Sequence, residues 1–283
     1  MSSKQRETKP SVGGSHRSIQ DLFRLDERTI VVTGGGGVVG LEAARSILET
    51  GGDVVCLDRQ DEPLPEPWKI VEKTAAKHGT KAWYYQCDIT KEEDVKRAFA
   101  SAVSGARFKL RGLLCCAGIS GEGPSLDFPI EQLRRIVDIN IAGTFLCAQA
   151  AAREIQKHGE PGSIVLIASM SGHVYNKGVD TTAYNSSKAA IVQMTRSLAA
   201  EWGSRAGIPL IRVNSISPGY INTRMSIGSM SEPGMQELWT SGNMLLRISE
   251  AHEYRGAIMY LLSDASSYMT GADMRVDGGH TAW

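Results

Sequence analysis

A tyrosine, a lysine and a serine are the residues of this chain best suited to moving a proton. Tyr184 and Lys188 are four residues apart in a segment with a helical pattern, so their side chains share one face of a helix. Ser169 ends an apolar, strand-like run upstream. A cation beside a phenol lowers the phenol's pKa from its ordinary value near ~10, and a hydroxyl can orient the same reacting oxygen. Together the three groups predict acid–base chemistry on an alcohol or a carbonyl.

A glycine-rich loop near the start of the chain predicts a nucleotide site. Residues 29–32 are β-branched and apolar, residues 33–40 read Thr-Gly-Gly-Gly-Gly-Val-Val-Gly, and residues 41–48 have a helical pattern. In a strand–loop–helix unit, glycines let the backbone approach a pyrophosphate, and the first N–H groups of the helix point at it. The residues expected to contact the cofactor here are Gly34, Gly36, Gly37, Val38, Val39 and Gly40.

The end of the second predicted strand bears on which dinucleotide would bind. Residues 53–58 are mostly apolar and end in Asp58, 18 residues after Gly40, where a carboxylate can accept hydrogen bonds from the adenosine ribose hydroxyls. The same charge would repel a 2′-phosphate, which favours NAD. Arg59 could bind that phosphate, so NADP stays open.

Further motifs, in the order in which they occur, resemble the short-chain dehydrogenase/reductase family from about Leu25 to the C-terminus. They are Cys87-Asp88-Ile89-Thr90, Cys115-Cys116-Ala117-Gly118, the run 138–145 around Asn140, the run 162–172, Pro218-Gly219-Tyr220-Ile221-Asn222-Thr223 and Val276-Asp277-Gly278-Gly279. The resemblance implies cofactor contacts from Asp58, Arg59, Asp88, Ile89, Cys116, Ala117, Gly118, Asn140, Tyr184, Lys188, Pro218, Gly219, Ile221 and Thr223. It also implies a catalytic set of Ser169, Tyr184, Lys188 and Asn140.

The resemblance implies a reaction as well. Tyr184 would give or take the proton of a carbinol while hydride passes to or from C4 of the nicotinamide, which interconverts a secondary alcohol and a ketone. Ser169 would hydrogen-bond the same oxygen. Lys188 would lower the pKa of Tyr184 and bind the nicotinamide ribose, and Asn140 would position Lys188 through a bound water.

Three features depart from the commonest pattern of the family. Val38 stands where a glycine is usual, and the resulting spacing is typical of the epimerase and dehydratase branch. Cys115 and Cys116 replace an Asn-Asn pair, which removes side-chain hydrogen bonds. Ser171 lies 12 residues before Tyr184, the commoner gap for the catalytic serine, whereas Ser169 lies 14 before it. We favour Ser169 because it directly follows the apolar strand.

The substrate prediction also rests on resemblance. Residues 168–173, 183–188 and 277–283 look like those of fungal polyol dehydrogenases and ketose reductases, which implies a polyol or ketose. The expected substrate contacts are Ser169, Ser171, His173, Tyr184 and Tyr220; for His173 the alternative is an ordinary loop histidine.

Other functions stay open. One is a ketoreductase of secondary metabolism that acts on a cyclic ketone and uses NADPH, and another is an epimerase or dehydratase. A third, of a different class, is a catalytically idle cofactor-binding regulatory or structural protein, against which the retained Ser169, Tyr184 and Lys188 argue.

Composition fits a single α/β enzyme domain. The chain has 283 residues, 42% of them hydrophobic, and alternating strand and helix patterns predict one Rossmann-type, doubly wound parallel sheet with helices on both faces over residues 25–283. A formal net charge of zero gives no electrostatic case for nucleic acid or a membrane surface. The five cysteines lack paired spacing, which favours a reducing, cytoplasmic location and no metal site.

The ends of the domain carry three further expectations. Residues 1–24 are expected to be a disordered tail, because residues 1–18 are rich in Ser, Gly, Lys and Arg. Residues 224–246, rich in Ser, Gly and Met, are expected to form a mobile substrate lid. Long helices are predicted over 131–157 and 182–203, and the family resemblance implies that they pair copies of the chain into a homodimer or homotetramer.

Overall fold

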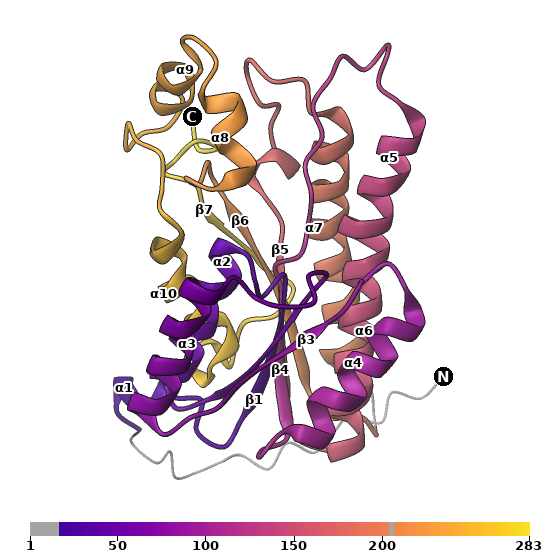
Figure 1. The fold of residues 1–283 in the computed structure, drawn as a ribbon, viewed down its shortest axis with the longest axis vertical. Helices are drawn as coiled ribbons and strands as arrows, with labels where there is room; N and C mark the ends of the chain where they lie inside the picture. Colours follow the sequence, from indigo (N-terminus) through magenta and orange to yellow (C-terminus); the bar gives the residue numbers. More distant parts are fainter. Residues whose placement is uncertain (1–16, 204–206) are drawn as a thin grey trace.

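The computed structural model describes residues 17–203 and 207–283, which build one seven-stranded parallel sheet in the order β3-β2-β1-β4-β5-β6-β7 (Figure 1). The strands are β1 (Thr29–Thr33), β2 (Asp53–Asp58), β3 (Ala82–Gln86), β4 (Leu110–Cys115), β5 (Gly162–Ile167), β6 (Ile211–Pro218) and β7 (Asp273–Val276). The order reverses between β1 and β4, and ligands of such sheets bind beyond the carboxyl ends of the strands at this point. The predicted doubly wound α/β fold is confirmed.

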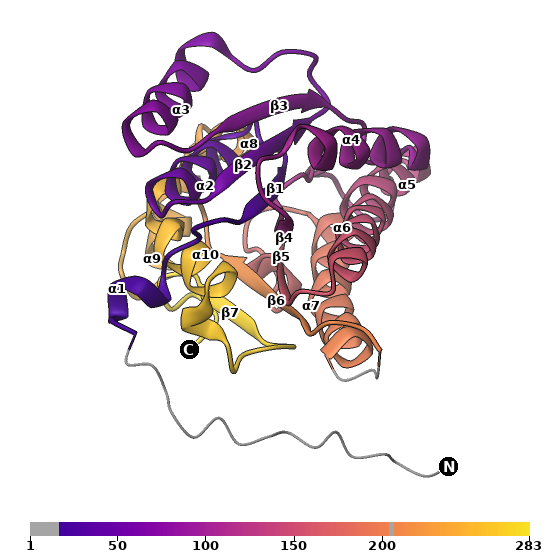
Figure 2. The same cartoon turned by 90° about the horizontal axis from the view of Figure 1, so that it is seen from below.

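Helices cover both faces of the sheet (Figure 2). One face packs against α2 (Val38–Glu49), α3 (Pro65–His78) and α10 (Arg255–Leu262), and the other against α4 (Glu92–Gly105), α6 (Thr144–His158) and α7 (Thr182–Gly203), with α5 (Ile130–Val137) alongside α7. Every residue of β1 is buried. A strand covered on both faces needs apolar side chains in succession, which explains the continuous run Ile30-Val31-Val32.

The predicted helix over 131–157 is interrupted at the residue that the sequence marks as functional. A π-helical segment, Asp138–Gly143, separates α5 from α6, and Asn140 lies within it with 1% of its surface exposed. Its Nδ2 donates to Ile119 O and to Ser187 Oγ, both at 2.9 Å, and its Oδ1 accepts from Ile119 N at 2.9 Å. The Asn140 amide therefore ties the segment after β4 to α7, and π segments are frequent at functional sites.

The predicted disordered tail does not hold for residues 17–24, whereas residues 1–16 lie outside the described part of the chain. Helix α1 (Ile19–Leu22) begins at Ser18, whose hydroxyl accepts from Asp21 N at 3.1 Å. Arg17 forms an ion pair with Asp264 at 2.7 Å. The Ser18 cap orders the helix locally, and the Arg17–Asp264 pair joins it to the C-terminal half of the chain. Composition does not reveal either contact.

The segment 224–246 follows β6 and contains two short helices, α8 (Arg224–Met230) and α9 (Met235–Ser241). Three 3-10 turns complete the fold: η2 (Met170–Gly172), η3 (Ala251–Tyr254) and η4 (Asp264–Ser266). Within residues 17–203 and 207–283, no helix is long and apolar enough to cross a membrane.

Candidate active site

A cavity of about 660 Å³ opens at the carboxyl edge of the sheet, where the strand order reverses. It brings together most of the residues that the sequence predicts for the site. Its lining includes Gly34, Gly36, Gly37, Val38, Val39, Gly40, Asp58, Arg59, Asp88, Ile89, Cys116, Ala117, Gly118, Ser169, Ser171, Tyr184, Lys188, Pro218, Gly219, Tyr220, Ile221 and Thr223. Asn140 and His173 do not line it.

The glycine loop has the geometry of a phosphate cradle. A Cβ on Gly40 would lie 2.3 Å from the carbonyl oxygen of Gly34, so the first turn of α2 can fold back on the loop only with glycine there. Gly37 precedes α2 without any side-chain cap, and the first turn has no acidic residue. The N–H groups of that turn therefore face the cavity with neither a protein acceptor nor a negative charge, as an anion site requires.

Two carboxylates end neighbouring strands along the same wall. Asp58 Oδ2 accepts from Gly36 N at 3.0 Å, which fixes the carboxylate beside the glycine loop. Asp88 Oδ1 accepts from Thr90 Oγ1 at 2.7 Å and from Thr90 N at 3.1 Å. Burial alone would raise the pKa of Asp88, but these hydrogen bonds outweigh it, and the pKa is lowered. Both groups are held as hydrogen-bond acceptors for a ligand.

Ser169 and Tyr184 both line the cavity. Ser169 Oγ accepts from Ser171 N at 3.1 Å and donates to Ser171 Oγ at 3.1 Å. Burial raises the pKa of the Tyr184 phenol, and the neighbouring Ser169 side chain opposes that shift. Both serines line the cavity, and the pKa of Tyr184 responds to Ser169, the serine favoured from the sequence.

Lys188 lies beside the Tyr184 ring, but its ammonium is hydrogen-bonded elsewhere. Its Nζ donates to Ile167 O at 2.8 Å and lies 5.7 Å from the centroid of the Tyr184 ring. Burial lowers the pKa of Lys188 to about 8, while the pKa of Tyr184 is raised and not lowered. Desolvation dominates both groups, since each loses water and neither is bonded to the other. The net rise of the Tyr184 pKa reflects burial, and the predicted lowering by Lys188 stays a prediction.

Gly172 sets the distance between the serine turn and α7. A Cβ at this position would lie 2.8 Å from the carbonyl carbon of Lys188 and 2.9 Å from Ala189 N, which are backbone atoms of α7. We expect Gly172→Ala to push η2 away from α7, to lower the free energy of unfolding by about 1–3 kcal/mol and to lower activity at least tenfold. Chemical denaturation and steady-state kinetics test this, with Gly256→Ala as the control, because Gly256 is exposed on α10 and a Cβ there would meet no atom within 4 Å. Unchanged activity would contradict it.

His173 is placed differently from the prediction. Its Nε2 lies 2.8 Å from Asp273 Oδ2 and 3.3 Å from Ser217 Oγ, outside the cavity lining. The prediction that it contacts substrate is not supported; the alternative of an ordinary, satisfied loop histidine fits. Tyr220 does line the cavity, where it stacks on Trp239 with ring centroids 4.0 Å apart and an interplanar angle of 5°.

Several lining residues were not predicted from the sequence. They include Gln60, Ser120, Glu122, Arg135 and Thr181, whereas Arg224 and Ser229 were expected only as part of the lid 224–246. Glu122 and Arg135 lie in a loop and on a helix face, where no local pattern indicates a site. Arg224 directly follows Thr223, and that adjacency was the available signal. Among the described residues, no group of three or more His, Cys, Asp or Glu side chains could hold a metal ion.

Comparison with known proteins identifies the family of the chain. The family model described as enoyl-(acyl carrier protein) reductase matches residues 37–281. The short chain dehydrogenases/reductase notP' of Aspergillus versicolor is 52% identical, over 98% of this chain and 95% of that protein. The NADP-dependent mannitol dehydrogenase of Hypocrea jecorina is 38% identical, over 92% of this chain and 95% of that protein. The crystal structure of the NADPH-dependent 3-quinuclidinone reductase of Rhodotorula rubra superimposes with a TM-score of 0.86 at 33% identity, over 98% and 99%.

The doubly wound sheet, the glycine cradle and these relatives define an NAD(P)-dependent oxidoreductase that acts on CH–OH groups and interconverts secondary alcohols and ketones. The chain belongs to the short-chain dehydrogenase/reductase family, and it is similar to the fungal polyol dehydrogenases within it.

Proposed function

We propose that Tyr184 is the general acid and base of this enzyme and that Ser169 orients the reacting oxygen. The observation that carries the proposal is that Ser169 and Tyr184 line the same cavity as the glycine loop, with the Ser169 hydroxyl close enough to oppose the rise of the Tyr184 pKa. In the direction of ketone reduction, the Tyr184 O–H donates its proton to the carbonyl oxygen while Ser169 holds that oxygen. The nicotinamide, when bound, supplies or accepts the hydride.

Lys188 and Asn140 support Tyr184 in this proposal. Lys188 is buried with its ammonium on Ile167 O, within the same cavity, and would hold the nicotinamide ribose. A Cβ on Gly118 would lie 3.3 Å from Asn140 Oδ1 and 3.6 Å from Lys188 Nζ, so the Asn140 amide and the Lys188 ammonium flank the same stretch of backbone. Asn140 thus acts by keeping that stretch and α7 in place.

We further propose that NAD is the preferred cofactor. The Asp58 carboxylate is fixed by Gly36 N beside the loop, where it would accept hydrogen bonds from ribose hydroxyls and repel a 2′-phosphate. The names of two relatives, which state NADP or NADPH dependence, point the other way. Arg59 lines the cavity next to Asp58 and would favour the phosphate if that carboxylate were neutral.

Replacing the charge of Asp58 tests this preference. In Asp58→Asn the side chain keeps an acceptor for Gly36 N but no longer repels a 2′-phosphate. We expect the ratio of kcat/KM for NADPH to that for NADH to rise roughly 100-fold, since a like-charge contact costs several kcal/mol. Steady-state kinetics with both nucleotides measure it, and Asp61→Asn, an exposed acid outside the cavity, is the matched control. A wild type that prefers NADPH would overturn the proposal.

For the substrate we propose a polyol and its ketose, as the similarity to mannitol dehydrogenase suggests. A second candidate is a cyclic, apolar ketone, and the wall beside Ser169 favours it. Asn176 Nδ2 donates to Ser171 Oγ at 2.8 Å, and Thr181 Oγ1 donates to Asn185 Oδ1 at 3.0 Å, so these polar groups already bond to one another. The stacked Tyr220 and Trp239 offer a flat apolar surface instead.

A rate comparison over two substrate panels separates the candidates. NADH oxidation is followed with ketoses, such as fructose and xylulose, and with cyclic ketones of increasing ring size. Under the first candidate kcat/KM is at least tenfold higher for a ketose, and under the second it is higher for a ring that fills the space beside Tyr220. No oxidation of NADH or NADPH with any of them would favour a catalytically idle binding protein.

We propose that the segment 224–246 closes over the bound substrate, because α8 and α9 both contribute to the cavity lining.

We also propose a homodimer or homotetramer in the cytoplasm. Ile130 and Leu133 on α5 and Phe145 on α6 are apolar and exposed on the single chain, as a helix face that pairs with another copy would be. Sedimentation equilibrium tests the assembly.

A further inference from the structure

Arg224 is a cation in the cavity with no partner in the protein. It is the first residue of α8, it is exposed, and it lines the cavity. Within residues 17–203 and 207–283, its guanidinium forms no ion pair and no hydrogen bond, whereas most other arginines there are paired with a carboxylate. A guanidinium held inside a binding cavity without a counter-charge is suited to an anionic group of a ligand.

The turn before Arg224 is held in one conformation by Ser226. Ser226 Oγ accepts from Thr223 N at 3.2 Å and donates to Ile221 O at 2.5 Å and Thr223 O at 3.0 Å. These hydrogen bonds fix the backbone direction in which the chain enters α8. Arg224 therefore starts from a defined backbone position, although it lies beside a segment of small and flexible residues.

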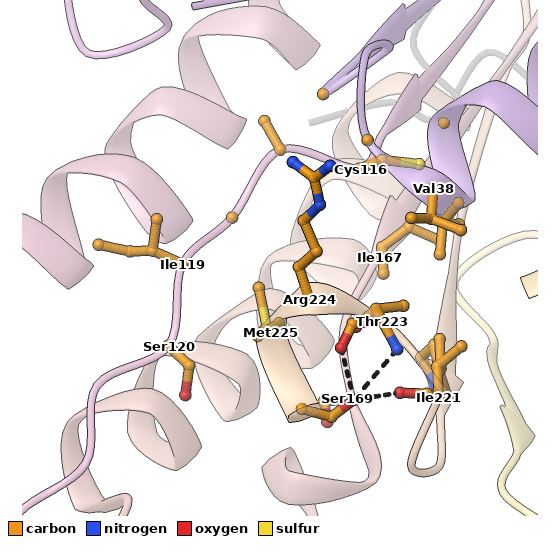
Figure 3. Close-up of a pocket in the computed structure, with 18 of the residues that line it drawn as sticks. Val38, Cys116, Ile119, Ser120, Ile167, Ser169, Ile221, Thr223, Arg224 and Met225 are labelled. Carbon is orange, nitrogen blue, oxygen red and sulfur yellow. Dashed lines mark hydrogen bonds between the residues drawn. The ribbon is translucent and has the colours of Figure 1, made fainter. Parts of the chain in front are cut away.

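The direction of the Arg224 side chain distinguishes between two possible anionic partners, an anionic substrate and the diphosphate of the cofactor. In Figure 3 the Arg224 side chain extends from α8 away from Ser169 and toward the part of the cavity that Cys116 and Val38 line. An anionic substrate would react at Ser169 and Tyr184. The diphosphate of a dinucleotide would instead lie between Asp58, which takes the adenosine ribose, and Tyr184, which faces the nicotinamide, and hence beside Val38 at the start of α2.

We infer that Arg224 binds the diphosphate of the cofactor, opposite the N-terminus of α2. This inference rests on the dinucleotide site proposed above and adds a residue to it. The α2 N–H groups would bind the diphosphate from one side, and the two guanidinium nitrogens of Arg224 would bind it from the other. Because Arg224 is part of α8, the cofactor would contact the segment 224–246 directly.

The test compares two ligands that differ by the charged group. Calorimetry gives Kd for ADP-ribose, which carries the diphosphate, and for adenosine, which does not. With Arg224→Gln we expect the Kd of ADP-ribose to rise about tenfold or more and that of adenosine to stay within twofold. Arg224→Lys should fall between, because an ammonium keeps the charge but not the planar fork. Arg196→Gln, exposed on α7 and outside the cavity, is the charge-matched control and should change neither Kd.

The other possible outcomes separate the role of Arg224 from the existence of the dinucleotide site. Wild type that fails to bind ADP-ribose would overturn the dinucleotide site itself. Equal ADP-ribose affinity in wild type and Arg224→Gln would overturn the role of Arg224 alone. A parallel loss of adenosine affinity would mean that the substitution disturbs the fold, which also overturns the inference; unfolding curves and Arg224→Lys show whether the fold is kept.

Discussion

Replacing Tyr184 by phenylalanine is expected to lower kcat for ketone reduction by about 1,000-fold or more. The variant keeps the aromatic ring that lines the cavity but loses the hydroxyl beside Ser169. Ser169, the hydroxyl beside it, is too weak an acid to take over the proton transfer. The affinity for NADH, measured by fluorescence titration, should remain within about twofold.

Tyr175→Phe is the matched control for that loss. Tyr175 is 58% exposed, its hydroxyl donates to Asp180 Oδ1 at 3.1 Å, and it lies outside the cavity lining. Activity of this variant should equal that of wild type. A Tyr184→Phe enzyme that keeps more than a tenth of the wild-type kcat would contradict the role assigned to Tyr184.

Replacing Lys188 by methionine is expected to abolish activity and yet to stabilise the fold at pH 7. Burial lowers the pKa of Lys188 to about 8 from 10.5, which means that holding its charged form inside the protein costs free energy. Methionine fills a similar volume without that cost, although the hydrogen bond to Ile167 O is lost. We expect the free energy of unfolding to rise by about 2 kcal/mol, measured by chemical denaturation.

The gain in the free energy of unfolding of Lys188→Met over wild type should shrink as pH rises. Below pH 8 Lys188 is charged in both the folded and the unfolded chain, and the full cost is present. Between pH 8 and 10.5 the folded chain binds fewer protons, so wild-type stability rises with pH relative to Lys188→Met, and the gain shrinks. Lys157→Met, at an exposed lysine on α6, should show neither effect. Destabilisation at pH 7, or a gain that is constant with pH, would contradict the account.

The fold and the outline of the site were predictable because their signals are local. Apolar runs that end in glycine or an acid predict buried parallel strands, and strand–glycine–helix order places Gly40 and Asp58 at one edge of the sheet. The pair Tyr184 and Lys188 follows from helical spacing alone. These features depend on residues that are close together in the chain.

What the sequence did not reveal depends on contacts between distant residues. The upward shift of the Tyr184 pKa arises because the cavity desolvates the phenol while the Lys188 ammonium is bonded to the end of β5. His173 turns from the cavity because Asp273, 100 residues later, binds it. Arg17 orders the start of α1 through Asp264. Helical spacing and composition carry no information about such partners.

Transfer of a deuterium label tests most directly the claim that Tyr184 delivers a proton beside a nicotinamide bound in this cavity. A ketone from the panels is reduced with NADH that carries deuterium at the transferable position of C4, and the alcohol is analysed by mass spectrometry. Wild type should place the deuterium on the carbinol carbon, whereas Tyr184→Phe should bind the nucleotide and form almost no labelled alcohol. Labelled alcohol formed equally fast by both proteins, or by neither with any ketone, would contradict the account.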